Sequence, residues 1–116
     1  MELKDLQQDP LIKATGWTDS DIPVFVMLGA DWCSYCVKQK PIVQKLAQDY
    51  AGKVRFEILN SDEHKDLKKA LGVSGIPAMF IFGKHLTELV YAKGYQGRIT
   101  LKRKIDRALA ATPPQA

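Results

Sequence analysis

The sequence predicts an α/β fold in which a central mixed β-sheet is flanked by helices. A wholly apolar run at residues 24–28, VFVML, is typical of a strand that is buried on both faces. It precedes a segment with helical spacing and then a second strand, which favours parallel pairing. Two further strands lie close together in the sequence and predict an antiparallel hairpin. Parallel and antiparallel pairs together make the expected sheet mixed.

The first half of the chain is expected to form strand, helix and strand. The helix is predicted at residues 34–50, and its apolar side chains recur at helical spacing: Ile42, Val43, Leu46, Ala47 and Tyr50. The second strand, VRFEIL at residues 54–59, alternates apolar and polar residues, so one of its faces is apolar. The chain between the two strands is long enough for a helical crossover, which is why we expect them to be parallel.

The second half is expected to form a short helix, a hairpin and a last helix. The short helix covers residues 63–71 and ends at Gly72, because glycine commonly terminates helices. The runs AMFIF at residues 78–82 and TELVY at residues 87–91 predict the hairpin. The last helix is predicted at about residues 98–110, where apolar residues again recur at helical spacing.

Length and composition indicate one domain. The 116 residues, 46% of them hydrophobic, can bury a single core without metals or several disulfides. We predict a lead segment at residues 1–21, the folded domain at residues 22–110 and a disordered tail at residues 111–116. We expect a monomer without a membrane span, because no apolar run is long enough to cross a bilayer. The start of the chain lacks the features of a secretory signal, which predicts a cytoplasmic protein if the chain is complete as written and a periplasmic one if a signal peptide has been removed.

The net charge is +4, from 17 Lys and Arg against 13 Asp and Glu. Part of the excess lies on the last predicted helix, at Arg98, Lys102, Arg103, Lys104 and Arg107. A basic helix can contact nucleic acid, but a solvated helix face is the simpler reading of these charges, so we predict no nucleic-acid partner.

Both cysteines lie in the motif WCSYC, at residues 32–36. The preceding strand and turn place Cys33 at the N-terminal edge of the first helix, with Cys36 one turn further along. Residues three apart on a helix share a face with Cβ atoms about 5–6 Å apart, so the pair can alternate between dithiol and disulfide with little motion. The free N–H groups and the positive end of the helix stabilise a thiolate, which predicts that Cys33 is the nucleophile.

A structural zinc site and a static disulfide both fit the cysteine pair less well. A structural zinc ion requires four ligands, but the chain has no second cysteine pair, and His64 and His85 are far apart in the sequence. A static disulfide over so short a loop would remove little entropy from the unfolded chain. We therefore predict no metal, and no other cofactor either, since no glycine-rich nucleotide-binding motif is present.

The motif and its surroundings resemble the thioredoxin family over residues 22–110. The sequence ADWCSYC is followed by Lys38 and Pro41, and later by GVSGIPAMFIF and KGYQG. The most specific feature is W-C-x-x-C combined with a downstream Gly-Ile-Pro before a strand. The resemblance implies the thioredoxin fold and a thiol:disulfide oxidoreductase that acts on protein disulfides and is re-reduced by an upstream dithiol donor.

The resemblance also implies which residues contact a partner. In the family the proline of the second motif is cis and faces the cysteines, so Ile76 and Pro77 are expected to form a groove for the partner's backbone. Trp32 and Gly94 are expected to line the surface around the nucleophile. With the two residues between the cysteines, the predicted substrate-binding set is Trp32, Ser34, Tyr35, Ile76, Pro77 and Gly94.

The chain departs from the family where protons are handled. Thioredoxins carry a buried aspartate in the strand before the motif, where this chain has Met27, and a lysine in the next strand, where it has Ile58. A methionine cannot accept a proton from the second cysteine. We therefore expect Cys36 to depend on solvent for deprotonation, unless an acid such as Asp31 or Glu57 lies within reach.

The residues between the cysteines leave several functions open. Ser34 and Tyr35 are neither the Gly-Pro of usual thioredoxins nor the Pro-His of strongly oxidising relatives, which favours a reductase. A glutathione-linked, glutaredoxin-like enzyme is one alternative, because Tyr35 fits its C-x-Y-C pattern, although Trp32 and the N-terminal segment favour thioredoxin. A periplasmic oxidant or isomerase and a non-catalytic binding module are the others.

Overall fold

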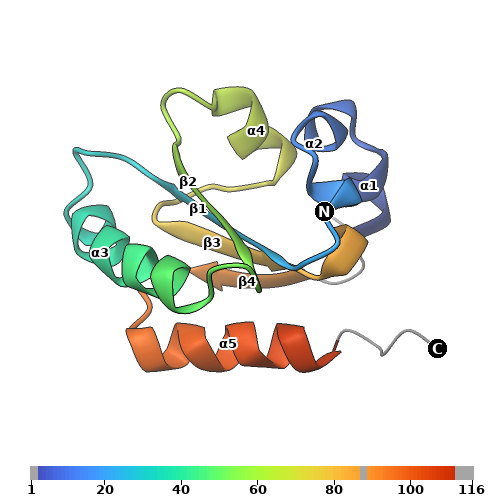
Figure 1. The fold of residues 1–116 in the computed structure, drawn as a ribbon. Helices are drawn as coiled ribbons and strands as arrows, with labels where there is room; N and C mark the ends of the chain where they lie inside the picture. The colour runs from blue at the N-terminus through green and yellow to red at the C-terminus, as the bar shows by residue number, and fades with distance from the viewer. Residues whose placement is uncertain (1–2, 87–88, 112–116) are drawn as a thin grey trace.

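The structure is a computed structural model that describes residues 3–86 and 89–111. Within these residues the middle layer is a sheet of four strands in the order β2-β1-β3-β4. The strands are β1 (Val24–Gly29), β2 (Arg55–Asn60), β3 (Ala78–Phe82) and β4 (Leu89–Lys93). Figure 1 shows that one face of the sheet is covered by α3 (Ser34–Asp49) and α5 (Arg98–Ala111). The other face carries α1 (Leu3–Gln8), α2 (Pro10–Ala14), α4 (Lys65–Ala70) and the short helices η1 (Trp17–Asp19) and η2 (Lys84–Leu86).

The pairing confirms the predicted α/β class with a mixed sheet. Strand β1 lies between β2, to which it is parallel, and β3, to which it is antiparallel. Strands β3 and β4 form the antiparallel hairpin. In the described part of the chain, no helix is both long and apolar enough to cross a bilayer.

Several boundaries differ from the predictions by one or two residues. Strand β4 continues to Lys93 because its register with β3 extends to Ala78, and the predicted strand start at residues 87–88 lies outside the described residues. Helix α4 begins two residues later than predicted, because the N–H groups of Glu63 and His64 donate to preceding carbonyls in a turn. Of the tail predicted at residues 111–116, Ala111 belongs to α5 and the rest lies outside the described residues.

Strand β1 is buried on both faces, as its apolar run predicts. Val24, Val26 and Leu28 pack into the core beneath α1, α2 and α4. Phe25 and Met27 point the other way, into the core beneath α3 and α5. The strand that leads to the cysteine motif is therefore held from both sides.

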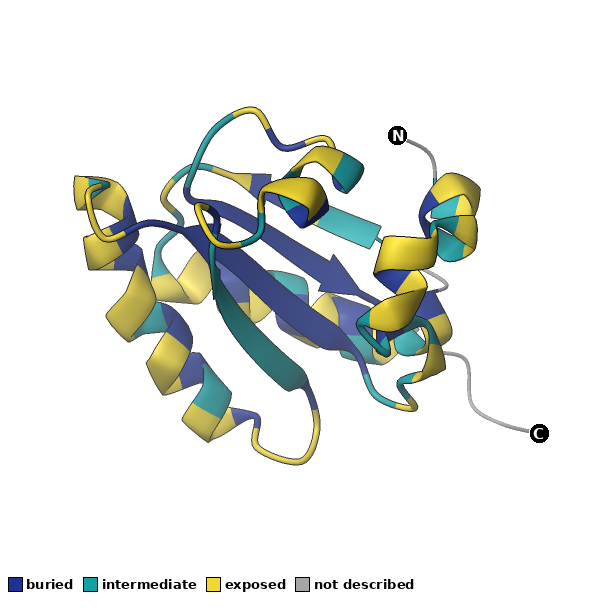
Figure 2. Cartoon of the chain, turned by 90° about the horizontal axis from the view of Figure 1, so that it is seen from above, coloured by how far each residue is buried: buried dark blue, intermediate teal, exposed yellow. Residues whose placement is uncertain are grey.

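The N-terminal segment packs into the same core as the sheet. Leu6, Ile12 and Trp17 are each at most 1% exposed. The Trp17 ring stacks on Phe82 with ring centroids 5.3 Å apart, and its indole N–H donates to the carboxylate of Glu57. Figure 2 shows the buried side of these helices facing the buried strands. The division at residue 21 stays a prediction, but residues on both sides of it share one core.

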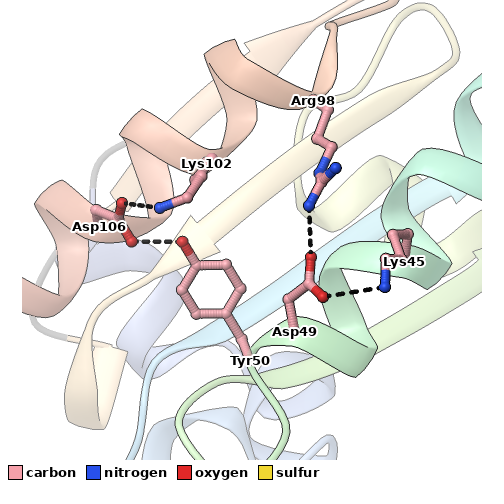
Figure 3. A network of polar contacts seen from close by, with 6 residues as sticks. All are labelled: Lys45, Asp49, Tyr50, Arg98, Lys102 and Asp106. Atoms are coloured by element: carbon pink, nitrogen blue, oxygen red, sulfur yellow. Dashed lines mark hydrogen bonds and ion pairs between the residues drawn. The ribbon is translucent and has the colours of Figure 1, made fainter.

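Helix α3 is fastened to α5 at the end away from the cysteines (Figure 3). The Tyr50 hydroxyl donates to the carboxylate of Asp106, which Lys102 also contacts at 2.9 Å. These two hydrogen bonds lower the pKa of Asp106, while burial and the same carboxylate raise the pKa of Tyr50. Arg98 contacts Asp49 at 3.1 Å. These contacts tie the C-terminal end of α3 to α5.

Candidate active site

The two cysteines meet at the N-terminus of α3. Cys33 is the N-cap residue with extended backbone (φ −96°, ψ 111°), and the N–H of Cys36 donates to its Sγ at 3.3 Å. The two residues form a disulfide, with Cα atoms 5.1 Å apart. Cys36 is 3% exposed, whereas Cys33 is only half-buried. Cys33 is therefore the sulfur that a reactant can reach, and the helix N–H that it accepts would stabilise its thiolate.

The loop before β3 lies against Cys33. The Ile76–Pro77 peptide bond is cis, as expected, and the Ile76 carbonyl oxygen is 3.8 Å from the Sγ of Cys33. The N–H of Gly94 donates to the Pro77 carbonyl at 2.9 Å, and Gly94 has a φ of +79°, a conformation that side chains disfavour. The structure thus places the Ile76 carbonyl against Cys33 and links Gly94 to the proline that follows Ile76.

The remaining predicted residues are exposed to solvent and adjoin the two cysteines in the sequence. Trp32 is 71% exposed, and its indole N–H donates to the Asp62 carboxylate at 2.7 Å, which fixes the direction of the ring. Tyr35 is 60% exposed, and Ser34 is exposed as well. Trp32 and Tyr35 thus expose aromatic rings on residues next to, and two positions after, Cys33 in the sequence.

The floor beneath Cys36 is apolar. The Cε of Met27 and the Sγ of Cys36 lie 3.1 and 3.3 Å from the place where a Cβ on Gly29 would stand, and both side chains belong to the same core. A glycine at position 29 leaves room for both. Met27 thus stands where the family resemblance would place a buried aspartate.

A cavity of about 540 Å³ opens beside this floor. Met27, Cys36 and Ile58 contribute to its wall, and its ionisable lining residues are Asp31, Lys40, Glu63 and His64. Of the two acids considered from the sequence, Asp31 shares the cavity with Cys36. Glu57 does not, because it bonds to Trp17 and contacts Arg55 at 3.4 Å. Cys36 therefore lies on the wall of a cavity that also holds ionisable side chains.

The structure adds two residues to this region that the sequence did not indicate. Gln39 is fully buried and bonds to the backbone of Gln96, and Asp62 holds Trp32. Gln39 could have been found, because it is the polar member of an otherwise apolar stripe on α3 with Cys36 and Val43. Asp62 lies in a loop, and no sequence pattern relates it to Trp32.

Comparison with known proteins identifies the same family that the motifs resemble. The Thioredoxin family model matches residues 14–107. The chain is 37% identical over 93 residues to thioredoxin M4, chloroplastic, of Arabidopsis thaliana, an alignment that covers 78% of this chain and 47% of the relative. It is 34% identical over 92 residues to thioredoxin 1 of Nostoc sp., covering 78% of this chain and 84% of that one.

A solved structure gives the same fold. The crystal structure of chloroplastic thioredoxin z matches with a TM-score of 0.78 at 19% identity, over 89% of this chain and 92% of that one. The chain spans about half the length of the Arabidopsis relative and most of the Nostoc relative. Fold, family model and relatives agree: the chain belongs to the thioredoxin family of thiol:disulfide oxidoreductases.

Proposed function

We propose that this protein reduces disulfides of other proteins, with Cys33 as the attacking residue and Cys36 as the resolving one. The observation that carries the proposal is the Cys33–Cys36 disulfide at the start of α3, where the accessible sulfur accepts a helix N–H and the second sulfur is buried. The first sulfur can meet a target protein, and the second can meet only the first.

The reaction transfers two electrons to the target. The Cys33 thiolate attacks one sulfur of the target disulfide, so a bond between Cys33 and the target forms while the target's other sulfur leaves and takes up a proton. Cys36 then loses its proton and attacks the Sγ of Cys33. The Cys33–Cys36 disulfide forms, and the target's remaining sulfur leaves as the second thiol. A separate dithiol donor must reduce the pair again.

The predicted groove residues would hold the target during this exchange. Three observations support this: the Ile76 carbonyl lies against Cys33, Gly94 is bonded to Pro77, and Trp32 is exposed directly before Cys33.

A protein-disulfide reduction assay tests the proposal. With dithiothreitol as the donor, the unmutated protein should accelerate the reduction of insulin disulfides, and Cys33→Ser should lower the rate to that of dithiothreitol alone, because no attacking sulfur remains. Lys13→Ala, a change at an exposed residue of α2 that leaves both sulfurs and the predicted binding residues in place, is the control. A Cys33→Ser protein as active as the unmutated one would contradict the proposal.

The alternative functions give other outcomes. A glutaredoxin-like enzyme would accept electrons from glutathione, a periplasmic oxidant or isomerase would introduce or shuffle disulfides, and a binding module would reduce nothing. Trp32 and the N-terminal helices, which pack Leu6 and Ile12 into the core, favour the thioredoxin-type reductase over the glutaredoxin-like enzyme.

A carboxylate at position 27 should accelerate the resolving step. Met27 and Cys36 pack in the same core above Gly29, so Met27→Asp would bring a proton acceptor into the surroundings of Cys36. We expect the release of a preformed Cys33 mixed disulfide to be about tenfold faster or more between about pH 6 and 8. The free energy of unfolding should fall by about 2–5 kcal/mol, because a carboxyl group is buried and a large side chain is lost.

Stopped-flow kinetics of that step provides the measurement. Met27→Leu is the control, since it keeps an apolar side chain of similar volume and should change neither the rate nor its pH dependence. If Met27→Asp resolves the mixed disulfide no faster than the unmutated protein, proton transfer at Cys36 is already efficient through the adjoining cavity.

A further inference from the structure

Gln39 links the cysteine-bearing helix to the loop between β4 and α5, residues 94–97. Its side-chain N–H donates to the Gln96 carbonyl at 3.0 Å, and its side-chain oxygen accepts the Gln96 N–H at 2.7 Å. Gln39 is 0% exposed, and both ends of its amide are used. Two such bonds from a buried amide fix the position and the direction of the loop.

The fixed loop presents an aromatic ring to the start of α3. Tyr95 precedes Gln96, and its ring centroid lies 6.3 Å from that of Tyr35, with the ring planes tilted by 45°. Both rings are substantially exposed, at 45% for Tyr95 and 60% for Tyr35. The pair is tied to the cysteine motif at both ends: Tyr35 lies between the two cysteines in the sequence, and Tyr95 follows Gly94, which is bonded to Pro77 in the loop that contacts Cys33.

Two lysine side chains lie near the tyrosine pair or the loop before Pro77. The Nζ of Lys38 is 5.6 Å from the centre of the Tyr35 ring, within the range of a cation–π contact. The side chain of Lys93 approaches Gly75, directly before Ile76, to within 4.0 Å of where a Cβ would stand. Exposed tyrosines that a buried contact holds in place suit recognition, since aromatic rings give large contact area at little cost in conformational entropy.

We propose that Tyr35 and Tyr95, held together by Gln39, recognise an aromatic side chain next to the reactive cysteine of the target, and that Lys38 favours a carboxylate beside it. The proposal rests on the proposed function and names its substrate class: a disulfide-bearing protein segment that is aromatic and acidic at the site of attack. Gln39 acts as a positioning residue, because it reaches the target only through the loop.

Matched cyclic disulfide peptides test the recognition. One peptide carries Phe beside the reactive cysteine and Glu after it, a second replaces Phe with Ser, and a third replaces Glu with Lys; dithiothreitol is the donor. We expect kcat/KM to be about two- to tenfold higher for the Phe peptide than for the Ser peptide, the range of an aromatic contact. Tyr95→Ala should bring this ratio close to one, and Lys38→Glu should reverse the preference for Glu over Lys.

Two variants separate recognition from folding. Tyr91→Ala removes another exposed tyrosine, which stacks on Phe80, and should keep the Phe to Ser ratio. Gln39→Met should raise KM for the Phe peptide several-fold while kcat, the reduction potential and the rate of exchange with dithiothreitol stay unchanged. A fall in kcat and in dithiothreitol exchange together would show that Gln39 supports the cysteines instead, and would contradict its positioning role.

The outcomes distinguish this proposal from the proposed function. Reduction of the Phe and Ser peptides at equal rates by the unmutated protein would overturn the recognition, and so would a Tyr95→Ala variant that keeps the preference. Reduction of none of the peptides, with insulin also left intact, would contradict the proposed function and this proposal with it.

Discussion

Cys36→Ser should accumulate stable mixed disulfides with target proteins, whereas Cys33→Ser should accumulate few. The accessible Cys33 can still attack in the first variant, but no second thiol is present to release the target. In the second variant the remaining sulfur, on Cys36, is 3% exposed, so a target cannot reach it. The expected difference is large because it depends on the presence or absence of an attacking atom.

Non-reducing electrophoresis of each variant after mixing with a disulfide-containing protein measures this difference. The double variant Cys33→Ser/Cys36→Ser gives the background of non-covalent association. Equal trapping by the two single variants would contradict the assignment of roles, even if the unmutated protein proves to be a reductase.

Trp17→Ala should lower the free energy of unfolding by about 3–5 kcal/mol, the range for truncation of a buried aromatic side chain. Trp17 is 1% exposed, stacks on Phe82 and donates to Glu57, so the variant leaves both a cavity and a carboxylate without its partner. The effect would come from a residue that precedes the predicted domain boundary at residue 22.

Urea denaturation of the oxidised protein measures the loss. Trp32→Ala is a matched control, since that tryptophan is 71% exposed and its removal should cost less than about 1 kcal/mol. A loss of stability no greater for Trp17→Ala than for Trp32→Ala would mean that the N-terminal helices contribute little to the fold.

The strands and long helices could be predicted because their residues face one kind of environment. VFVML is apolar throughout and forms a strand that is buried on both faces, while Val54, Phe56 and Ile58 alternate and contact one core. The cysteine pair could be placed as well, because a strand followed by a short turn and a helix leaves few positions for Cys33 and Cys36.

The connections between distant segments could not be predicted in the same way. The bond from Gln39 to Gln96 and the one from Trp32 to Asp62 join residues far apart in the chain, and hydrophobic periodicity carries no information about such pairs. The turn that shortens α4 depends on local backbone bonds of Glu63 and His64. The surroundings of Cys36 likewise required the structure, which places Asp31 in the same cavity and Glu57 elsewhere.

The reduction potential of the Cys33–Cys36 pair tests the central claim most directly. Equilibration with dithiothreitol buffers of known potential gives the value. Ser34 and Tyr35 supply no positive charge that would strongly stabilise the reduced thiolate, so we expect a potential more negative than about −230 mV, near the value of about −270 mV for thioredoxin. A potential near −120 mV, that of a strong protein oxidant, would contradict a reductase and reverse the direction of electron flow.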